Sequence, residues 1–549
     1  MLDKSGPAPR GAVRFFRATH LPGVLAAALV ALPFLSLTQL ALHGDPDLWP
    51  HLARFVLPTA LVQTTLLLAG VGALTAIAGA GSAWLITTFE FPGRAVLLWL
   101  LPLPMAIPTY IAAYIYADLI GSPVHTLAGA ILIFSAVLYP YVYLAARAMF
   151  QTHFVVFTDA ARALGAPPWR LLRDITVPMA RPALAVGIVL AMLETLNDIG
   201  ASEYLGVPTL TLSIFTTWLN RGSLGGAAQI AVALLAVVVG LIAIERYGRR
   251  GQVVLPTQDT RTADRIVLSR GSAWLCAAAC GLPALLGFVI PAAYLLNQVI
   301  RRGLLARFDA ELLTHALNTI AISAAATALI LLIAVAAVMP TRSGHHPLLR
   351  MSLAVASFGY AVPGTVLALG LLSPLVAFDE TANWLLRQIG MPHVGLLLAG
   401  STAGLVIAYC VRFLTVGIGF VQSGLMRVPS DMDEMAQMLG ARRFALFRSI
   451  HLPMMRPALW GAALLIFVDC LKELPATLLL RPLNVETLST YIYQYATRGN
   501  FEEGALAALL IVSAGILPVL RLVHLAETAP RAHRRSAPLT APAFSASQP

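Results

Sequence analysis

The segment Glu434-Met-Ala-Gln-Met-Leu-Gly440, followed by Leu452-Pro453, occurs twice in this chain of 549 residues. The first copy is Asp159-Ala-Ala-Arg-Ala-Leu-Gly165, followed by Val177-Pro178, and it stands 275 positions earlier. The acidic residue, the glycine and the proline keep their spacing in both copies. A repeat of this length predicts that the chain contains two copies of one structural unit.

Each copy is predicted to form two short helices that meet at a glycine. Helix-forming residues lead to Gly165 and Gly440, and glycine suits the left-handed residue that often ends a helix. A second helix should then run to the residue before Pro178 and Pro453. Apolar residues recur at every third position of that second helix, as in an amphipathic element: Trp169, Leu172 and Ile175 in the first copy, and Phe444, Phe447 and Ile450 in the second. One such segment alone would be interpreted as a helix resting on the bilayer, but its duplication favours a docking role.

The repeated pattern resembles the EAA loop of ATP-binding-cassette importer permeases, in which a cytoplasmic coupling helix docks on the ATPase subunit. Met435 stands where that family usually has alanine, and Asp159 stands where it usually has glutamate. Both copies keep the negative charge and the turn. The resemblance implies a coupling role for Asp159, Ala160, Ala161, Gly165 and Pro178 in the first copy, and for Glu434, Ala436, Gly440 and Pro453 in the second.

The composition is that of a polytopic membrane protein. Hydrophobic residues make up 58% of the chain and charged residues only 11%, against about 25% charged residues in soluble globular proteins. The net charge of +11 comes from arginines in short loops, which the positive-inside rule explains, so we expect no nucleic-acid partner. The four cysteines fall in apolar runs and are interpreted as packing residues.

Apolar stretches of about 20 residues, long enough to cross a bilayer, form two sets of six. The first set lies near 21–42, 56–86, 95–118, 126–148, 182–200 and 228–245, and the second near 272–300, 312–338, 349–377, 394–418, 458–480 and 504–524. The fold class is therefore predicted to be all-α, with about twelve transmembrane helices. The repeats should be parallel, unlike the inverted repeats of many secondary transporters.

Two further matches between the halves lie 255 positions apart. Gln63-Thr64 corresponds to Asn318-Thr319, and Pro108 corresponds to Pro363. Since the loops are displaced by 275 positions, the second half carries a 20-residue insertion after Pro363. The predicted domains are a cytoplasmic N-terminus (1–20), a first permease repeat (21–250), a cytoplasmic linker (251–271), a second permease repeat (272–528) and a disordered tail (529–549).

The arginines also predict an orientation. They concentrate in the repeated loops, the linker and the tail, so these segments and both termini are expected on the cytoplasmic side of a bacterial inner membrane. Residues 205–225 should then lie in the periplasm. The arginines at 301, 302 and 307 are an exception to this pattern.

The sequence shows no pattern of a catalytic or ATP-binding site. Its two lysines are Lys4 and Lys472, and neither lies in a phosphate-binding glycine-rich loop. The motifs of common hydrolases and metalloproteases do not occur. The chain is therefore predicted not to be an enzyme and to bind no cofactor itself, with ATP and Mg²⁺ held by a partner ATPase.

The segments that follow the two loops resemble the fused permeases of ferric-iron importers. They are Asn197-Asp-Ile-Gly-Ala-Ser-Glu-Tyr-Leu-Gly206 and Asp469-Cys-Leu-Lys-Glu-Leu-Pro-Ala-Thr-Leu-Leu-Leu-Arg-Pro482. The resemblance covers nearly the whole chain. It implies ferric iron as the substrate, with a periplasmic ferric-iron-binding protein, two copies of an ATPase subunit and the lipid bilayer as partners. Fused permeases for thiamine and for phosphonates share this architecture and remain an alternative, as does an ion-gradient-driven secondary transporter.

Four acidic residues in or beside the predicted spans repeat at the same displacement of 275 positions. Glu194 corresponds to Asp469, and Asp198 corresponds to Glu473. Within each half the two acidic residues, Glu194 with Asp198 and Asp469 with Glu473, have i, i+4 spacing and share one helix face. Carboxylates in a membrane are costly enough to indicate function. We predict that the four residues line the substrate path, with no stable metal site but with transient passage of iron at Asp198 and Glu473. The competing interpretation is that they pair with Lys472, with Arg481 or with backbone groups and brace the outer gate.

Tyrosines cluster near the predicted span ends and are interpreted mostly as interfacial aromatic residues. They are left out of the predicted site. The set comprises Tyr110, Tyr114, Tyr116, Tyr139, Tyr141, Tyr143, Tyr491, Tyr493 and Tyr495.

Overall fold

The computed structural model describes residues 16–152, 165, 167–249, 265–306, 309–343 and 346–532. The first half contains α1 (Phe16–His43), α2 (Trp49–His51), α3 (Leu57–Thr88), α4 (Arg94–Leu100), α5 (Thr109–Ile120), α6 (Leu127–Thr152), α8 (Pro168–Leu171), α9 (Val177–Asn197), α10 (Gly200–Tyr204), α11 (Leu210–Leu219) and α12 (Leu224–Gly248). The second half contains α13 (Arg270–Ala284), α14 (Ile290–Arg301), α15 (Ala310–Val338), α16 (Pro347–Ala356), α17 (Gly364–Gln388), α18 (Thr402–Met426), α19 (Ser430–Met438), α20 (Arg443–Leu446), α21 (Leu452–Leu471), α22 (Pro475–Leu480), α23 (Leu488–Thr497) and α24 (Ala505–Ala532).

The described residues form an almost entirely helical, polytopic fold. Eleven helices in this part of the chain are long and apolar enough to cross a membrane, and the bent pair of α4 and α5 would make a twelfth. Two short strands, β1 (Phe89–Glu90) and β2 (Ile266–Val267), pair in parallel. The predicted all-α fold is confirmed. The predicted cytoplasmic N-terminus as far as residue 15, most of the linker (250–264) and the tail from residue 533 lie outside the described residues.

The third predicted span is broken in each half. In place of 95–118, α4 and α5 are separated by a bend of 97°. In place of 349–377, α16 ends at Ala356 and α17 begins at Gly364. The residues directly before α5 and α17 are Pro108 and Pro363, both with an extended ψ near 140°. The stretches predicted as the third span thus contain a break at a proline, which lacks the N–H that would continue the preceding helix.

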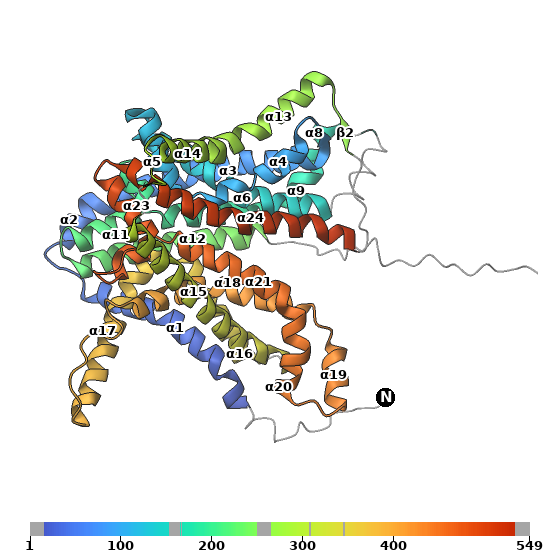
Figure 1. Ribbon diagram of the computed structural model, residues 1–549. Coiled ribbons are helices and arrows are strands. Elements are labelled where there is room, and N and C mark those ends of the chain that lie inside the picture. The colour runs from blue at the N-terminus through green and yellow to red at the C-terminus, as the bar shows by residue number, and fades with distance from the viewer. Residues whose placement is uncertain are drawn as a thin grey trace, which may run out of the picture.

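The insertion in the second half displaces the next helix. α17 continues for 25 residues, whereas α5 has 12. As a consequence, the span predicted at 394–418 begins only at Thr402, in α18. Figure 1 shows the end of α17 projecting away from the bundle.

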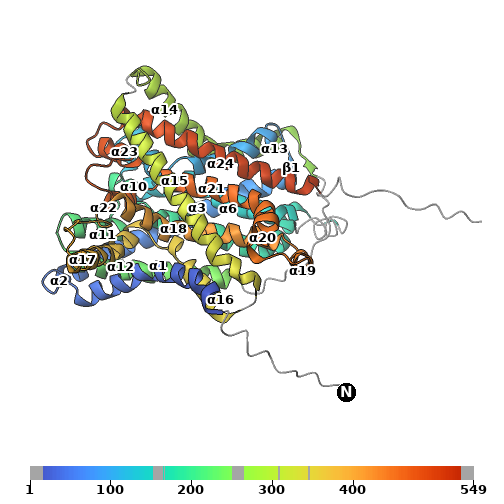
Figure 2. The same cartoon turned by 60° about the horizontal axis from the view of Figure 1, so that its bottom comes forward.

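The two halves are interlocked. α1 packs on α15, α16 and α17 of the second half, while α13 and α14 pack on α3, α4 and α5 of the first. Both views show α1 beside α16 (Figures 1 and 2). One hydrophobic cluster joins Val30 and Leu234 of the first half to Leu367 and Val411 of the second. Neither repeat therefore contains a complete core of its own.

The helices of the repeated loops lie at one end of the bundle. Figure 1 shows α8, α19 and α20 at this end, which we call the α19 face, and α2, α11 and α23 at the opposite end, which we call the α23 face. α9 leads away from α8 toward the α23 face, and α21 leads away from α20 in the same direction. The ends of α9 and α21, where the predicted carboxylates lie, are therefore remote from the loops.

The repeated loops turn where the glycines predicted. Gly440 follows α19 with φ of 80°, and Gly165 has φ of 77°. The second helix of each loop was predicted to end before the proline. Instead it continues through a π-helical turn into α9 and α21. These turns are Leu172–Thr176 and Phe447–His451, and Pro178 and Pro453 lie in the first turn of the helix that follows. Proline donates no backbone hydrogen bond, and in the second loop the π-helical turn directly before it closes on Leu452, whose N–H bonds to the Phe447 carbonyl.

Candidate functional site

A cavity of about 70 Å³ lies between the two halves, and both contribute to its wall. It would hold a few water molecules or a small hydrated ion, since one water needs about 10–15 Å³. All four predicted carboxylates line it, so the structure brings together residues that are far apart in the sequence. The polar and charged lining comprises Thr109, Tyr110, Tyr141, Glu194, Asn197, Asp198, Tyr360, Arg412, Asp469, Lys472 and Glu473.

Asp198 and Glu473 accept hydrogen bonds from backbone N–H groups of the short helices that follow them, in equivalent positions of the two halves. The Ala201 N–H donates to Asp198 Oδ1 at 2.7 Å, at the start of α10. The N–H groups of Ala476 and Thr477 donate to the two oxygens of Glu473 at 3.0 Å, at the start of α22. Carboxylates at helix N-termini satisfy unpaired N–H groups and interact favourably with the helix dipole. The geometry of these two residues therefore matches the competing interpretation, in which the carboxylates pair with backbone groups.

Contacts at Glu194 and Asn197 join the halves across the cavity. The Tyr360 hydroxyl donates to Glu194 Oε1 at 2.6 Å. The Asn197 Oδ1 atom accepts from the Gly364 N–H at 2.8 Å and from Arg412 Nη1 at 2.6 Å. Each bond has one partner in the first half and one in the second, so together they link the two halves at the cavity wall.

The remaining charges of the cavity are in the second half. Lys472 Nζ lies 2.9 Å from Asp469 Oδ1, and Arg412 Nη1 lies 3.8 Å from Glu473 Oε1. The lining thus has four carboxylates and two cations. With all six ionised, it carries an excess of two negative charges.

Sequence reasoning missed several residues of this cavity. Tyr110 and Tyr141 had been assigned to the interfacial belt, but they line the cavity, and Tyr114, Tyr139 and Tyr143 are fully buried. The interfacial interpretation is wrong for Tyr110 and Tyr114 because α5 is a short helix inside the bundle, buried from Tyr110 to Ala117. It is wrong for Tyr139 and Tyr143 because they lie on the buried side of α6. Tyr360 and Arg412 were not singled out at all. An arginine in the apolar stretch of α18 is costly in a membrane, and that signal would have identified Arg412.

Of the second loop, the structure describes every predicted coupling residue. Glu434 and Gly440 are exposed, while Ala436 and Pro453 are half-buried. Large apolar side chains are exposed around them on the α19 face: Met435, Met438, Leu439 and Phe444. In the first loop Gly165 and Pro178 are exposed, whereas the predicted coupling residues Asp159, Ala160 and Ala161 lie outside the described residues.

A buried carboxylate ties the second loop to the bundle. Asp433 Oδ2 accepts from Arg342 Nε at 2.5 Å, and Asp433 Oδ1 lies 2.8 Å from His451 Nε2. Arg342 also donates to the backbone carbonyls of Val428 and Pro429. Burial alone would raise the pKa of Asp433, but the hydrogen bonds from Arg342 and His451 outweigh burial and hold the pKa below its ordinary value. This cluster joins α19 to the 3-10 turn Met339–Ser343 after α15 and to the π-helical turn Phe447–His451 before α21.

The first half lacks the residues of this cluster. At displacements of 255 and 275 positions, threonines stand in place of Arg342, Asp433 and His451, at positions 87, 158 and 176 respectively. The cluster of Arg342, Asp433 and His451 therefore has no counterpart of the same residue types in the first half of the sequence.

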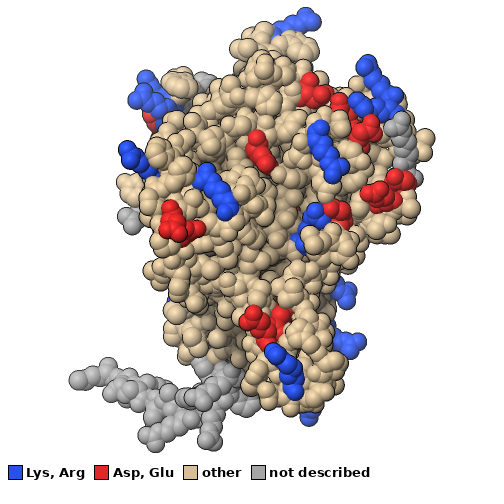
Figure 3. All heavy atoms as spheres, turned by 90° about the vertical axis from the view of Figure 1, so that its left-hand side faces the viewer, with Lys and Arg blue, Asp and Glu red and all other residues tan. Residues whose placement is uncertain are grey.

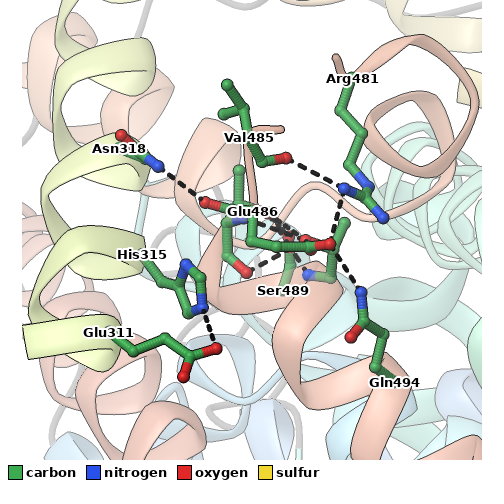
Figure 4. A network of polar contacts seen from close by, with 10 residues as sticks. Glu311, His315, Asn318, Arg481, Val485, Glu486, Ser489 and Gln494 are labelled. Atoms are coloured by element: carbon green, nitrogen blue, oxygen red, sulfur yellow. Dashed lines mark hydrogen bonds and ion pairs between the residues drawn. The ribbon is translucent and has the colours of Figure 1, made fainter. Parts of the chain in front are cut away.

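The α23 face carries mixed charge. Figure 3 shows basic and acidic side chains interspersed over this face, with neither sign forming a continuous patch. A network around Glu486 lies at the start of α23 (Figure 4). Arg481 Nη1 and Gln494 Nε2 each lie 2.7 Å from Glu486 Oε1, and Asn318 Nδ2 donates to the Glu486 carbonyl. Arg481 thus pairs with Glu486 and not with the carboxylates of the cavity.

Comparison with known proteins gives matches over both halves. The sequence signature of the family described as "Binding-protein-dependent transport system inner membrane component" matches residues 75–250 and again 330–531. The Fe(3+)-transport system permease protein FbpB 2 of Haemophilus influenzae is 24% identical over 91% of this chain and 96% of its own length. The molybdenum transport system permease protein ModB of Escherichia coli is 28% identical over 30% of this chain and 81% of its own length. The sulfate transport system permease protein CysT of Escherichia coli is 26% identical over 35% of this chain and 78% of its own length.

Proposed function

Because this chain belongs to the family of inner-membrane components of binding-protein-dependent transport systems, with the family unit present twice, we propose that it is the fused permease of a ferric-iron importer. A periplasmic binding protein delivers the ion, and two copies of a separate ATPase drive its release. The similarity to a ferric permease along nearly the full length of both chains supports this substrate.

The observation that carries the choice of a cation over the anionic substrates is the sign of charge in the cavity. Relatives named for molybdenum and sulfate transport match parts of the chain, and molybdate, sulfate and phosphonates are anions. Two like charges 4 Å apart repel by about 4 kcal/mol at an effective dielectric constant of 20. The lining has two more carboxylates than cations, so it favours a cation, and carboxylate and phenol oxygens suit a hard cation such as ferric iron.

The second loop supports the coupling role. Its exposed apolar residues, Met435, Met438, Leu439 and Phe444, surround the exposed Glu434. Apolar patches of this kind on a polar rim are typical of protein-protein contacts. We assign them to the ATPase contact, which places the α19 face in the cytoplasm and the α23 face in the periplasm.

A growth test addresses the substrate. Cells without this gene should fail to grow with ferric iron as the sole iron source, and the intact gene should restore growth. Supplying ferrous iron should bypass the defect. Normal growth on ferric iron, combined with a growth defect at low molybdate, sulfate, phosphonate or thiamine, would contradict the assignment.

A further inference from the structure

We propose that Glu194 and Asp469 form the binding site for the transported cation, and that the Lys472 ammonium group occupies this site as a tethered cation when no substrate is present. The inference rests on the proposed function, since the cation is taken to be ferric iron. It names the residues of the cavity that bind the ion and the group that the ion displaces.

The first observation is the position of Lys472. Its Nζ atom lies 2.9 Å from Asp469 Oδ1, and the two side chains are only 21% and 11% exposed. The sole other lysine of the chain is Lys4. Placing an ammonium group in a mostly buried site is costly unless a carboxylate compensates it. A cation is therefore already held in the wall of the cavity.

The second observation separates the four carboxylates into two kinds. Both oxygens of Glu473, and both of Asp198, accept hydrogen bonds at the starts of α22 and α10 or from Thr109. In the hydrogen bonds and ion pairs of the described residues, Glu194 uses only Oε1 and Asp469 only Oδ1. Glu194 and Asp469 thus keep acceptor capacity for an ion, whereas Asp198 and Glu473 serve the backbone.

A third observation points to a ligand in the cavity. Tyr110 lines it, is 4% exposed, and its hydroxyl has no hydrogen-bond partner among the described residues. A buried hydroxyl without a partner is costly, and a bound ion or its water would satisfy it. Tyr141 and Tyr360 add further phenol oxygens to the same wall. Such hard oxygen donors match a trivalent cation.

The two halves differ at one position of this site. Lys472 corresponds to Asn197, whose side-chain oxygen already accepts from Gly364 and Arg412. The cavity therefore has two equivalent carboxylates, Glu194 and Asp469, but one tethered ammonium. Both carboxylates line the same cavity, and a trivalent cation carries enough charge to compensate both, whereas a single ammonium compensates one. An entering ion should displace Lys472, and the lysine should return when the ion leaves.

The test measures terbium(III) binding by the full-length permease assembled with its ATPase. Terbium is a hard trivalent cation whose emission is excited through nearby aromatic rings. Lys472→Met should bind terbium at least tenfold more tightly than wild type, because the competing charge is gone. Lys472→Arg, which keeps the charge, should bind as wild type does. Adding Glu194→Gln and Asp469→Asn to Lys472→Met should abolish the gain.

Arg481→Met is the matched control. Arg481 lies 2.7 Å from Glu486 in an ion pair that is about as buried as that of Lys472, with side chains 19% and 22% exposed. It belongs to the network of Figure 4 and not to the cavity wall. It should leave terbium affinity unchanged. Equal affinity in wild type and Lys472→Met, or a gain that survives removal of both carboxylates, would overturn the proposal.

Iron uptake by the same preparations separates this proposal from the proposed function. Iron uptake together with unchanged terbium affinity in Lys472→Met would refute the tethered-cation site and leave the iron assignment standing. The expected terbium binding without any iron uptake would support the site and count against iron as the substrate.

Discussion

At the scale of single residues, Asp433 shows how one carboxylate fixes the second loop. It lies within hydrogen-bonding distance of both Arg342 and His451. Because its pKa is lowered in the folded protein, Asp433 stabilises the fold at pH values above its ordinary pKa of 3.8, and this contribution is lost as the pH falls through the lowered pKa. At neutral pH the contribution is fully present.

Replacing Asp433 by asparagine should therefore loosen α19. Removing a charged hydrogen-bond partner typically costs about 1.5–3 kcal/mol. In Asp433→Asn, the backbone amide hydrogens of residues 430–438 should exchange with solvent faster than in wild type. The increase in exchange rate, measured by hydrogen exchange, should correspond to this loss of free energy. Asp431→Asn is the control: Asp431 is exposed, and exposed substitutions change stability by about 0.5 kcal/mol or less. Equal effects of the two variants would show that Asp433 is not the tie.

At the scale of elements, the two-helix loop depends on the backbone of Gly440. Its φ is 80°, a conformation that strains any β-branched residue, and an added Cβ would meet no atom within 4 Å. Gly440→Val should therefore distort the turn without a steric clash. ATP-driven uptake should be lost while the protein still inserts in the membrane, and Gly165→Val, at φ of 77°, should weaken uptake.

Gly419→Val serves as the control for this pair. Gly419 lies in α18 with an ordinary helical backbone, and it also has no atom within 4 Å of an added Cβ. Uptake by this variant should stay near wild type. Full uptake by both loop variants would mean that the loops do not transmit the ATPase movement.

At the scale of the whole molecule, the arrangement of the two faces predicts the topology. Asn220, exposed between α11 and α12, should be periplasmic, and Met438, 89% exposed at the end of α19, should be cytoplasmic. Single cysteines at these positions, in a background without the four native cysteines, can be labelled in intact cells with an impermeant thiol reagent. We expect labelling at 220 and none at 438. The reverse result would invert the orientation.

The interlocked halves limit what the duplication alone implies. Two repeats in sequence suggest two separable units, yet α1 packs on α16 and α17 of the other half. The prediction of two permease domains at 21–250 and 272–528 is therefore a statement about sequence units, and each unit relies on the other for its core.

The sequence by itself determined the features that depend on local chemistry. An apolar stretch long enough to cross a bilayer forms a helix in the membrane, because its backbone N–H and C=O groups must hydrogen-bond to one another where no water is present. The positive φ of Gly165 and Gly440 followed from the freedom of a residue without Cβ. The repeated Gln63-Thr64 and Asn318-Thr319 also have one structural role, since Thr64 and Thr319 each accept an N–H at the start of α11 or α23.

Only the tertiary structure decided which carboxylates accept hydrogen bonds from backbone N–H groups and which bind side chains in the cavity. Glu194, Asp198, Asp469 and Glu473 look alike in the sequence. Their difference arises from their partners: Tyr360 reaches Glu194 across the interface between the halves, whereas Lys472 and Arg412 lie beside Asp469 and Glu473 within the second half. The broken third spans and the buried tyrosines of α5 likewise depended on packing. Proline and tyrosine suit several environments, and the neighbouring helices select one, because burial is a property of the assembled bundle and not of a segment.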